Sequence, residues 1–323
     1  MEAIELFAGA GGAALGLEAA GIGHQALVEW DRHACATLRA AGLGPVVEGD
    51  VRDLLAIERA AGSSPDLLWS SFPCQAWSVA GQRKGASDER NGWPWTVDAI
   101  DWFRPRWFLA ENVRGLLNHS AEGHPDPYQC PRCYFDGVIL AQLWARFEHV
   151  GYWLLNAADY GVPQHRRRVI IWAGPAPLQA PRATHGDPGK ARQGDQFGPG
   201  VLPWVSMAKA LGVAAEVCAT TGDHDKGRPV VPVVGPSPPL RANMGKDRRV
   251  WMMSGTPFID GPERRRLTVA EAARLQDFPD GHPWQGPKTA QYRQIGNAVP
   301  PRLAEVVGRQ VVAADRLLTT EQG

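Results

Sequence analysis

Short apolar runs and amphipathic stretches alternate through most of the chain. The runs that predict buried strands cover residues 3–8, 26–28, 45–48, 67–69, 107–110, 153–159 and 169–173. The stretches with helical spacing cover residues 13–20, 93–103, 138–150, 267–275 and 302–318. Thr268 and Glu271 predict a capping box at the start of the fourth helix. We therefore expect an α/β fold, a Rossmann-like domain whose sheet is mostly parallel and carries helices on both faces.

The alternation is lost between residues 174 and 263, where Pro, Gly and Trp are common. This stretch is also locally basic, with cations at Lys226, Arg228, Arg241, Lys246, Arg248 and Arg249. We interpret residues 175–287 as a small, irregular, β-rich domain with a variable core at about 175–262. Residues 1–174 and 288–323 would form the larger domain.

Composition narrows the classes of protein that this chain can be. With 34 basic and 34 acidic residues, any nucleic-acid surface must come from local clustering of charge. No apolar run is long enough to span a membrane, and the first strand starts too early to leave room for a signal peptide. Five Cys residues at irregular spacing argue against a disulfide framework. We expect a monomeric, cytoplasmic, nucleoid-associated protein with no membrane partner.

The first strand breaks at a glycine turn, residues 9–12, and a helix follows. Such a turn brings backbone N–H groups to a ligand, although alone it is weak evidence for a cofactor. The next two strands end at Glu29 and Asp50, which could accept hydrogen bonds from ribose hydroxyls and an adenine amino group. No Lys or Arg in the turn could meet a pyrophosphate. The three strand ends therefore predict S-adenosylmethionine rather than a dinucleotide.

The fourth apolar run, residues 67–69, leads to Pro73 and Cys74. Residues 79–91 follow as a predicted loop that is rich in Gly and charge. A strand that ends in this way can present a nucleophile at the carboxyl edge of an α/β sheet. The plainer interpretation of Cys74 is a buried structural thiol. The loop is either a solvated connection or a hinged lid whose cations meet phosphates.

Two further features favour chemistry at this edge. Glu111 ends the next strand and is a candidate acid. Arg166 and Arg168 enter the last strand with the two-residue period of a strand, so both can serve one site while Arg167 faces away.

Taken together, these motifs make the chain resemble the DNA cytosine-5 methyltransferases over nearly its whole length. Eight motifs occur in the order of that family: ELFAGAGG at 5–12, EWD at 29–31, GD at 49–50, FPCQ at 72–75, ENV at 111–113, QHRRR at 164–168, RLTVAEAARLQDFP at 266–279 and GNAV at 296–299. The resemblance implies a methyltransferase that uses S-adenosyl-L-methionine and acts on double-stranded DNA, with a target-recognition domain at 175–287. A companion restriction endonuclease would be a further partner.

The resemblance also implies roles for individual residues. The catalytic residues would be Cys74 as nucleophile, Glu111 as the acid at cytosine N3, and Arg166 and Arg168, which hold the flipped base. The cofactor pocket would be lined by Phe7, Gly9, Gly11, Glu29, Trp30, Asp50, Val51, Pro73, Asn297 and Val299. We assign DNA contacts to Gln75, Ser78, Arg83, Lys84, Gln164, Arg228, Arg241, Lys246 and Arg248.

The chain departs from the family pattern in two places. Glu5 stands where Asp is commoner. An insert after the Glu111 strand contains Cys130 and Cys133, with His119 and His124 nearby. Two Cys residues at this spacing can hold one zinc ion if other ligands complete the site, and the alternative is a loop with two thiols.

Three other functions compete with DNA methylation. A tRNA cytosine methyltransferase of the same fold is disfavoured by the long basic segment, which is typical of duplex recognition. A non-catalytic DNA-binding relative is disfavoured because Cys74 and Glu111 are both present. An oxidoreductase with the same core would leave the Pro-Cys-Gln sequence unexplained.

Overall fold

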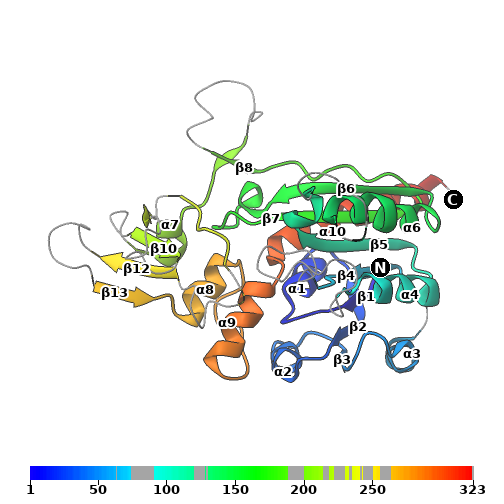
Figure 1. The fold of residues 1–323 in the computed structure, drawn as a ribbon, viewed down its shortest axis with the longest axis horizontal. Coiled ribbons are helices and arrows are strands. Elements are labelled where there is room, and N and C mark those ends of the chain that lie inside the picture. The colour runs from blue at the N-terminus through cyan, green and yellow to red at the C-terminus, as the bar shows by residue number, and fades with distance from the viewer. Residues whose placement is uncertain are drawn as a thin grey trace.

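The computed structural model describes residues 1–62, 64–73, 91–119, 128, 130–187, 200–213, 218–221, 230–232, 235–240, 242, 250–254 and 263–321. A seven-stranded sheet in the order β3-β2-β1-β4-β5-β7-β6 organises the larger part of the chain (Figure 1). Its strands are β1 (Glu2–Leu6), β2 (Gly23–Glu29), β3 (Val46–Glu48), β4 (Leu67–Ser70), β5 (Trp107–Val113), β6 (His149–Asn156) and β7 (Arg167–Gly174).

The first five strands of this sheet are parallel. Only β7 runs antiparallel to its neighbours, β5 and β6. The chain passes from β1 to β2 on one side and later returns to β4 on the other, so the strand order reverses at β1. Ligands of open α/β sheets bind at such a reversal. The predicted mostly parallel, Rossmann-like sheet is confirmed.

Alternate side chains of the central strands enter two separate cores. In β4, Leu68 packs under the helices of one face, whereas Leu67 and Trp69 pack under those of the other. The first face is covered by α3 (Leu54–Ala61), α4 (Trp93–Phe103) and a continuous helical segment made of α5 (Pro131–Tyr134), the π-helix η3 (Phe135–Leu140) and α6 (Ala141–Trp144). The second is covered by α1 (Gly12–Ala19) and α10 (Pro301–Glu321). Helices on both faces are thus confirmed as well.

Helices α1 and α10 approach each other very closely. A Cβ atom added to Gly16 would lie 2.1 Å from the carbonyl oxygen of Pro301, and one added to Gly12 would lie 2.1 Å from that of Val299. Further along α10, Asp315 accepts a hydrogen bond of 2.9 Å from the indole of Trp107 on β5. The helix that comes last in the sequence therefore supports the first glycine turn and the middle of the sheet.

The stretch from 175 to 287 contains short strands, as its irregular pattern predicts. Two of them, β8 (His185–Gly186) and β9 (Leu202–Pro203), pair with each other. An antiparallel sheet in the order β11-β10-β12-β13 is formed by β10 (Cys218–Thr221), β11 (Val230–Pro232), β12 (Val250–Ser254) and β13 (Glu263–Arg266).

A third core joins this region to the rest of the molecule. It is shared by α7 (Met207–Leu211), α8 (Val269–Leu275) and α9 (Lys288–Asn297), and Leu15 of α1 packs against it. Helices α8 and α9 accordingly lie between the small sheet and α1 (Figure 1). The expected boundary between residues 287 and 288 falls inside this shared core.

Several element boundaries differ from the expected ones for local reasons. The helix expected at 138–150 starts earlier, because Cys130 caps α5 and Pro131 occupies its first position. It ends at Trp144, and β6 begins at His149. Helices α2 (Arg32–Ala40) and α3 were not predicted, although Asp31 and Asp53 cap them. Helix α9 was also missed, whereas the Thr268–Glu271 capping box of α8 is confirmed. None of the helices in the described ranges is both long enough and apolar enough to cross a membrane.

Candidate active site

The carboxyl ends of β1, β2, β4 and β5 meet at one edge of the large sheet. Since these strands are parallel neighbours, the residues that follow them lie side by side despite their separation in sequence. This edge receives the glycine turn after β1, the Glu29 region after β2, the Phe72–Pro73 segment after β4 and Glu111 within β5. The topology thus gathers the candidate residues that sequence patterns alone left scattered.

The glycine turn has an unusual backbone. Phe7 and Gly9 both have φ of +58° and Gly11 has φ of +87°, values in the left-handed region that favours glycine. A Cβ added to Gly9 would meet no atom within 4 Å, so this position borders open space. Gly11, by contrast, faces the side chains of Leu38 and Leu43, the nearer at 2.4 Å from an added Cβ. Gly11 therefore serves packing in this structure, while Gly9 faces outward.

Glu29 organises the turn from the neighbouring strand. Its buried carboxylate accepts hydrogen bonds from the backbone N–H groups of Gly9 (2.8 Å), Trp30 (3.0 Å) and Asp31 (2.8 Å). Burial raises the pKa of Glu29, and the three donors act in the opposite direction. The adjacent indole of Trp30 is 77% exposed, which leaves a large aromatic face uncovered beside a polar acceptor.

Asp50 and Val51 follow β3 and differ in exposure. Val51 is buried in the core. Arg52 Nε donates to both carboxylate oxygens of Asp50, at 2.9 and 3.0 Å, and lowers the pKa of that carboxyl group. The guanidinium of Arg52 also lies 5.1 Å from the ring centre of Trp95. Asp50 is consequently held as an ionised acceptor.

The junction of α9 and α10 closes the other side of the turn. Val299 is buried and places its carbonyl oxygen against Gly12, while Asn297, the last residue of α9, is exposed. The His282 ring is hydrogen bonded to the backbone of Ala10, inside the turn itself. Residues from the end of the sequence thus enclose the glycine turn.

Two contacts fix the backbone on either side of residues 74–90. The carbonyl oxygen of Phe72 accepts a hydrogen bond of 3.2 Å from the side-chain amide of Asn112. A Cβ added to Gly92 would lie 2.6 Å from Cδ of Pro73, so Pro73 and Gly92, on either side of this segment, lie close together. Asn112 was not predicted as a site residue, yet it follows Glu111 directly and holds the chain just before Cys74.

Glu111 forms an ion pair with Arg168, from Oε1 of the carboxylate to Nε of the guanidinium. The antiparallel pairing of β5 and β7 sets Arg168 opposite Val113, two residues beyond Glu111 and on the same side of the strand. Both side chains are largely buried, at 10% and 13% exposure. As expected, Arg167 is exposed and faces away.

Known proteins show which family has this arrangement. The model of the C-5 cytosine-specific DNA methylases matches residues 1–187 and 215–313. The chain belongs to this family.

Relatives that match nearly the whole chain support the assignment of this protein to the family. It is 35% identical to the type II methyltransferase M.NgoMIV of Neisseria gonorrhoeae, over 96% of this chain and 97% of that protein. It is 34% identical to M.NaeI of Lentzea aerocolonigenes, over 97% of this chain and 75% of that one. The fold is shared with the Schizosaccharomyces pombe Dnmt2 methyltransferase (TM-score 0.68, 14% identity, 98% of this chain and 99% of that one). It is also shared with the Entamoeba histolytica methyltransferase EhMeth (TM-score 0.68, 15% identity, 97% and 98%).

Arg166 and Gln164 of this methylase hydrogen bond to other segments of the chain. Arg166 is 1% exposed and donates to the carbonyl oxygens of Leu240 (3.0 Å) and Gly296 (2.9 Å). Gln164 is completely buried, donates to the carbonyl oxygen of Leu275 and accepts from the N–H of Leu240. The expectation that Gln164 contacts DNA is therefore not met in this structure, because its amide is used inside the protein.

Other expected residues of the methylase lie outside the described part of the chain. They are the nucleophile candidate Cys74 and the DNA-contact candidates Gln75, Ser78, Arg83, Lys84, Arg228, Arg241, Lys246 and Arg248. His124 of the insert belongs to the same group.

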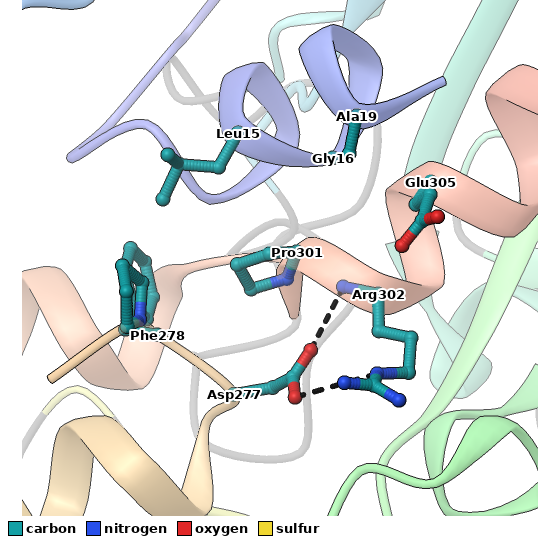
Figure 2. A pocket seen from close by; sticks show the side chains of 9 residues that line it. Leu15, Gly16, Ala19, Asp277, Phe278, Pro301, Arg302 and Glu305 are labelled. Carbon is teal, nitrogen blue, oxygen red and sulfur yellow. Dashed lines mark hydrogen bonds and ion pairs between the residues drawn. The ribbon is translucent and has the colours of Figure 1, made fainter.

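A hollow of about 330 Å³ lies where α1, the residues after α8 and the start of α10 meet (Figure 2). Asp277 accepts a hydrogen bond of 2.9 Å from the backbone N–H of Arg302 and lies 3.6 Å from its guanidinium, which fixes α8 to the start of α10. Figure 2 shows Leu15 and Gly16 across the hollow from this pair. None of the candidate catalytic or cofactor residues lines it, so we interpret it as a seam between elements.

Proposed function

We propose that this methylase transfers a methyl group from S-adenosyl-L-methionine to C5 of a cytosine in double-stranded DNA, with Cys74 as nucleophile and Glu111 as acid. One observation supports these roles for Cys74 and Glu111. The Glu111–Arg168 pair lies at the sheet edge where β4 ends and the chain runs through Phe72 and Pro73 to Cys74. The family model, which describes DNA methylases, favours DNA over tRNA as the substrate.

The chemistry explains why these residue types are needed. C5 of cytosine is too weak a nucleophile to react with a methyl donor unaided. Addition of the Cys74 thiolate to C6, with a proton passed from Glu111 to N3, converts C5 into an enamine carbon. After methylation, a base removes the C5 proton and the C6–S bond breaks, which releases the thiolate. Arg168 occupies Oε1 of Glu111, so Oε2 would meet N3, and the guanidinium charge would also favour the thiolate form of Cys74.

The glycine turn and its neighbours fit the cofactor. When bound, S-adenosyl-L-methionine supplies an electrophilic methyl group. The open space at Gly9 would admit it close to the backbone, Glu29 and the ionised Asp50 would accept its hydrogen bonds, and the exposed ring of Trp30 would cover its adenine. Phe7, Val51, Pro73, Asn297 and Val299 would complete the walls.

We further propose that residues 175–287 recognise the target sequence, while residues 1–174 and 288–323 carry the chemistry. The basic residues of the 226–249 segment would contact phosphates and bases, and those of residues 79–91 would approach the phosphates beside the flipped cytosine. Because the relatives named above are type II methyltransferases, a restriction endonuclease with the same target is the partner we expect.

Trapping of the covalent adduct tests the roles of Cys74 and Glu111. Fluorine at C5 cannot leave as a cation, so a duplex carrying 5-fluorocytosine in the target site should give a denaturation-resistant complex that requires cofactor. Cys74→Ser should abolish the complex, because an alcohol is far less ionised than a thiol at neutral pH. Glu111→Gln should slow its formation with little change in cofactor affinity.

The control is Cys35→Ser, since Cys35 is a buried thiol whose pKa is raised to about 12. It should still form the complex. Normal methylation by Cys74→Ser, or an adduct mapped to another Cys, would contradict the proposal.

A further inference from the structure

Three potential metal ligands converge in the insert that follows the Glu111 strand. His119, Cys130 and Cys133 come from two separate backbone segments, yet their ligand atoms all lie within 4.8 Å of one another. His119 follows the 3₁₀-helix η2 (Arg114–Leu117), and both Cys residues belong to the start of α5. Cys130 is buried, Cys133 is half-buried and His119 is exposed, so the cluster opens to solvent on the His119 side.

The separation of Cys130 and His119 is close to that of two ligands in a tetrahedral metal site. Bonds of about 2.3 Å to sulfur and about 2.0 Å to nitrogen place the S and N ligands of one zinc ion roughly 3.6 Å apart. Sγ of Cys130 and Nδ1 of His119 lie 3.9 Å apart in this structure. A shift of a few tenths of an ångström would therefore bring both atoms to bonding distance of a single ion.

The backbone holds this geometry before any ion arrives. The N–H of Arg132 donates to the carbonyl oxygen of Asn118 at 3.2 Å, which ties the residue before His119 to the turn between the two Cys residues. The N–H of Cys133 donates to Sγ of Cys130 at 3.4 Å, which holds the two Cys residues together. The guanidinium of Arg132 is engaged by Asp136 and Tyr152 and so points at partners outside the cluster.

We propose that His119, Cys130 and Cys133 bind one zinc ion, the fourth position being open to water or a further ligand. Two thiolates and an imidazole in tetrahedral geometry are typical of Zn²⁺ and unsuited to Mg²⁺ or Ca²⁺. Each Cys that binds as a thiolate releases its proton to solvent, and the ion undergoes no redox change. The site stands whether or not the catalytic roles proposed above are correct.

The ion would fasten η2 to α5 close to the proposed active site. Tyr134, the residue after Cys133, accepts a hydrogen bond of 2.9 Å from the side-chain amide of Asn91. Asn91 is the first described residue after Cys74. A zinc ion at the start of α5 would thus stabilise the element that holds Asn91.

Metal analysis of the full chain, purified without chelator in the presence of a thiol reductant, tests the proposal. We expect about one zinc ion per chain in the parent protein and less than about 0.2 in the Cys130→Ser/Cys133→Ser double variant. His119→Asn should lose most of the zinc as well. The matched controls are Cys35→Ser, a buried Cys of α2, and His149→Asn, a half-exposed His at the start of β6, and both should keep the metal.

A titration of the metal-free parent protein keeps the test decisive if a variant fails to fold. Co²⁺ should produce the near-ultraviolet charge-transfer band of thiolate ligation, and Zn²⁺ should bleach that band and release protons. Less than about 0.2 zinc per chain in the parent together with no such band would overturn the site. So would full zinc retention by the double variant, or a Cys130–Cys133 disulfide in the reduced parent protein.

Discussion

At the scale of single residues, two arginines of one motif have different partners. Arg168 pairs with Glu111, whereas Arg166, two positions earlier, donates to the backbone of two distant segments. The two-residue period correctly indicates that both turn inward and that Arg167 turns outward. The period cannot indicate the partner of each arginine, because the carbonyl oxygens that Arg166 binds belong to Leu240 and Gly296, which are distant in sequence.

Arg168→Ala should therefore impair chemistry rather than cofactor binding. Without the guanidinium, Glu111 loses the contact that orients it, and we expect kcat to fall about 100-fold. Cofactor affinity, measured by calorimetry, should change little because the contacts of Glu29 are untouched. Arg167→Ala is the matched control and should keep kcat close to that of the parent. Equal losses in the two variants would contradict this role for Arg168.

His282 gives the fold a defined acid sensitivity. Burial lowers the pKa of His282 from 6.5 to about 4, so the folded protein resists a proton that the unfolded chain accepts. The free energy of unfolding should consequently fall as the pH drops from 6.5 toward 4, and this contribution should level off below that range.

His282→Gln should remove that part of the pH dependence. We expect the difference in unfolding free energy between the variant and the parent to shift by about 1–3 kcal/mol in favour of the variant between neutral and acid pH. Urea denaturation at several pH values measures it. A difference that does not vary with pH would show that His282 is not the group responsible.

At the scale of elements, Gln164 connects segments that the sequence gives no reason to link. Its amide joins the segment around Leu240 to the end of α8, and it is completely buried. A polar residue in an arginine-rich motif is ordinarily interpreted as a DNA contact, and burial is the information that the motif lacks.

Gln164→Ala should for this reason lower stability by about 1–3 kcal/mol, since the N–H of Leu240 loses its acceptor. The slope of DNA affinity against salt concentration should stay the same, because no phosphate contact is removed. Denaturant unfolding and a salt series of binding measurements check the two statements. A smaller salt slope together with unchanged stability would show that Gln164 does contact DNA.

The contact of α1 with α10 depends on glycine in the same way. A Cβ at Gly16 would strike the backbone of Pro301, and the nearest atoms belong to rigid helices. Gly16→Ala should thus lower the unfolding free energy by about 1–3 kcal/mol or more. Gly137→Ala is the matched control, because its Cβ would meet no atom within 4 Å, and its stability should stay constant or rise by up to about 1 kcal/mol. Equal changes in the two variants would mean that packing against Pro301 does not set the effect.

At the scale of the whole molecule, the sequence predicts the seven-stranded sheet better than the four-stranded one. Apolar runs such as 67–69 are enclosed on both faces, so their pattern survives folding and reveals the strands. The third core is different, because α7, α8 and α9 contribute to it from separate parts of the chain. The hydrophobic period within each helix does not indicate which other helices it contacts. The strands of the small sheet are short, which weakens their signal further.

A segment exchange tests the proposal that target recognition and catalysis are carried by different parts of the chain. Replacing residues 175–262 by the corresponding segment of a relative that methylates a different sequence should move methylation to the site of the donor. Bisulfite sequencing of plasmid DNA from cells that produce the chimera reads the new site. An active chimera that still methylates the original site would place recognition elsewhere, and the Cys74 adduct assay would show separately whether the catalytic part is intact.

The close approach of α1 and α10 has a consequence for the order in which the molecule matures. The glycine turn leaves the ribosome well before Val299 and Pro301, whose carbonyl groups lie against Gly12 and Gly16. At about 5–20 residues per second, roughly tens of seconds pass before those residues are made. Until then Ala13 and Leu17 lack the apolar surface of α10 that finally covers them. The glycine turn and α1 therefore reach their final packing only after α10 has been synthesised.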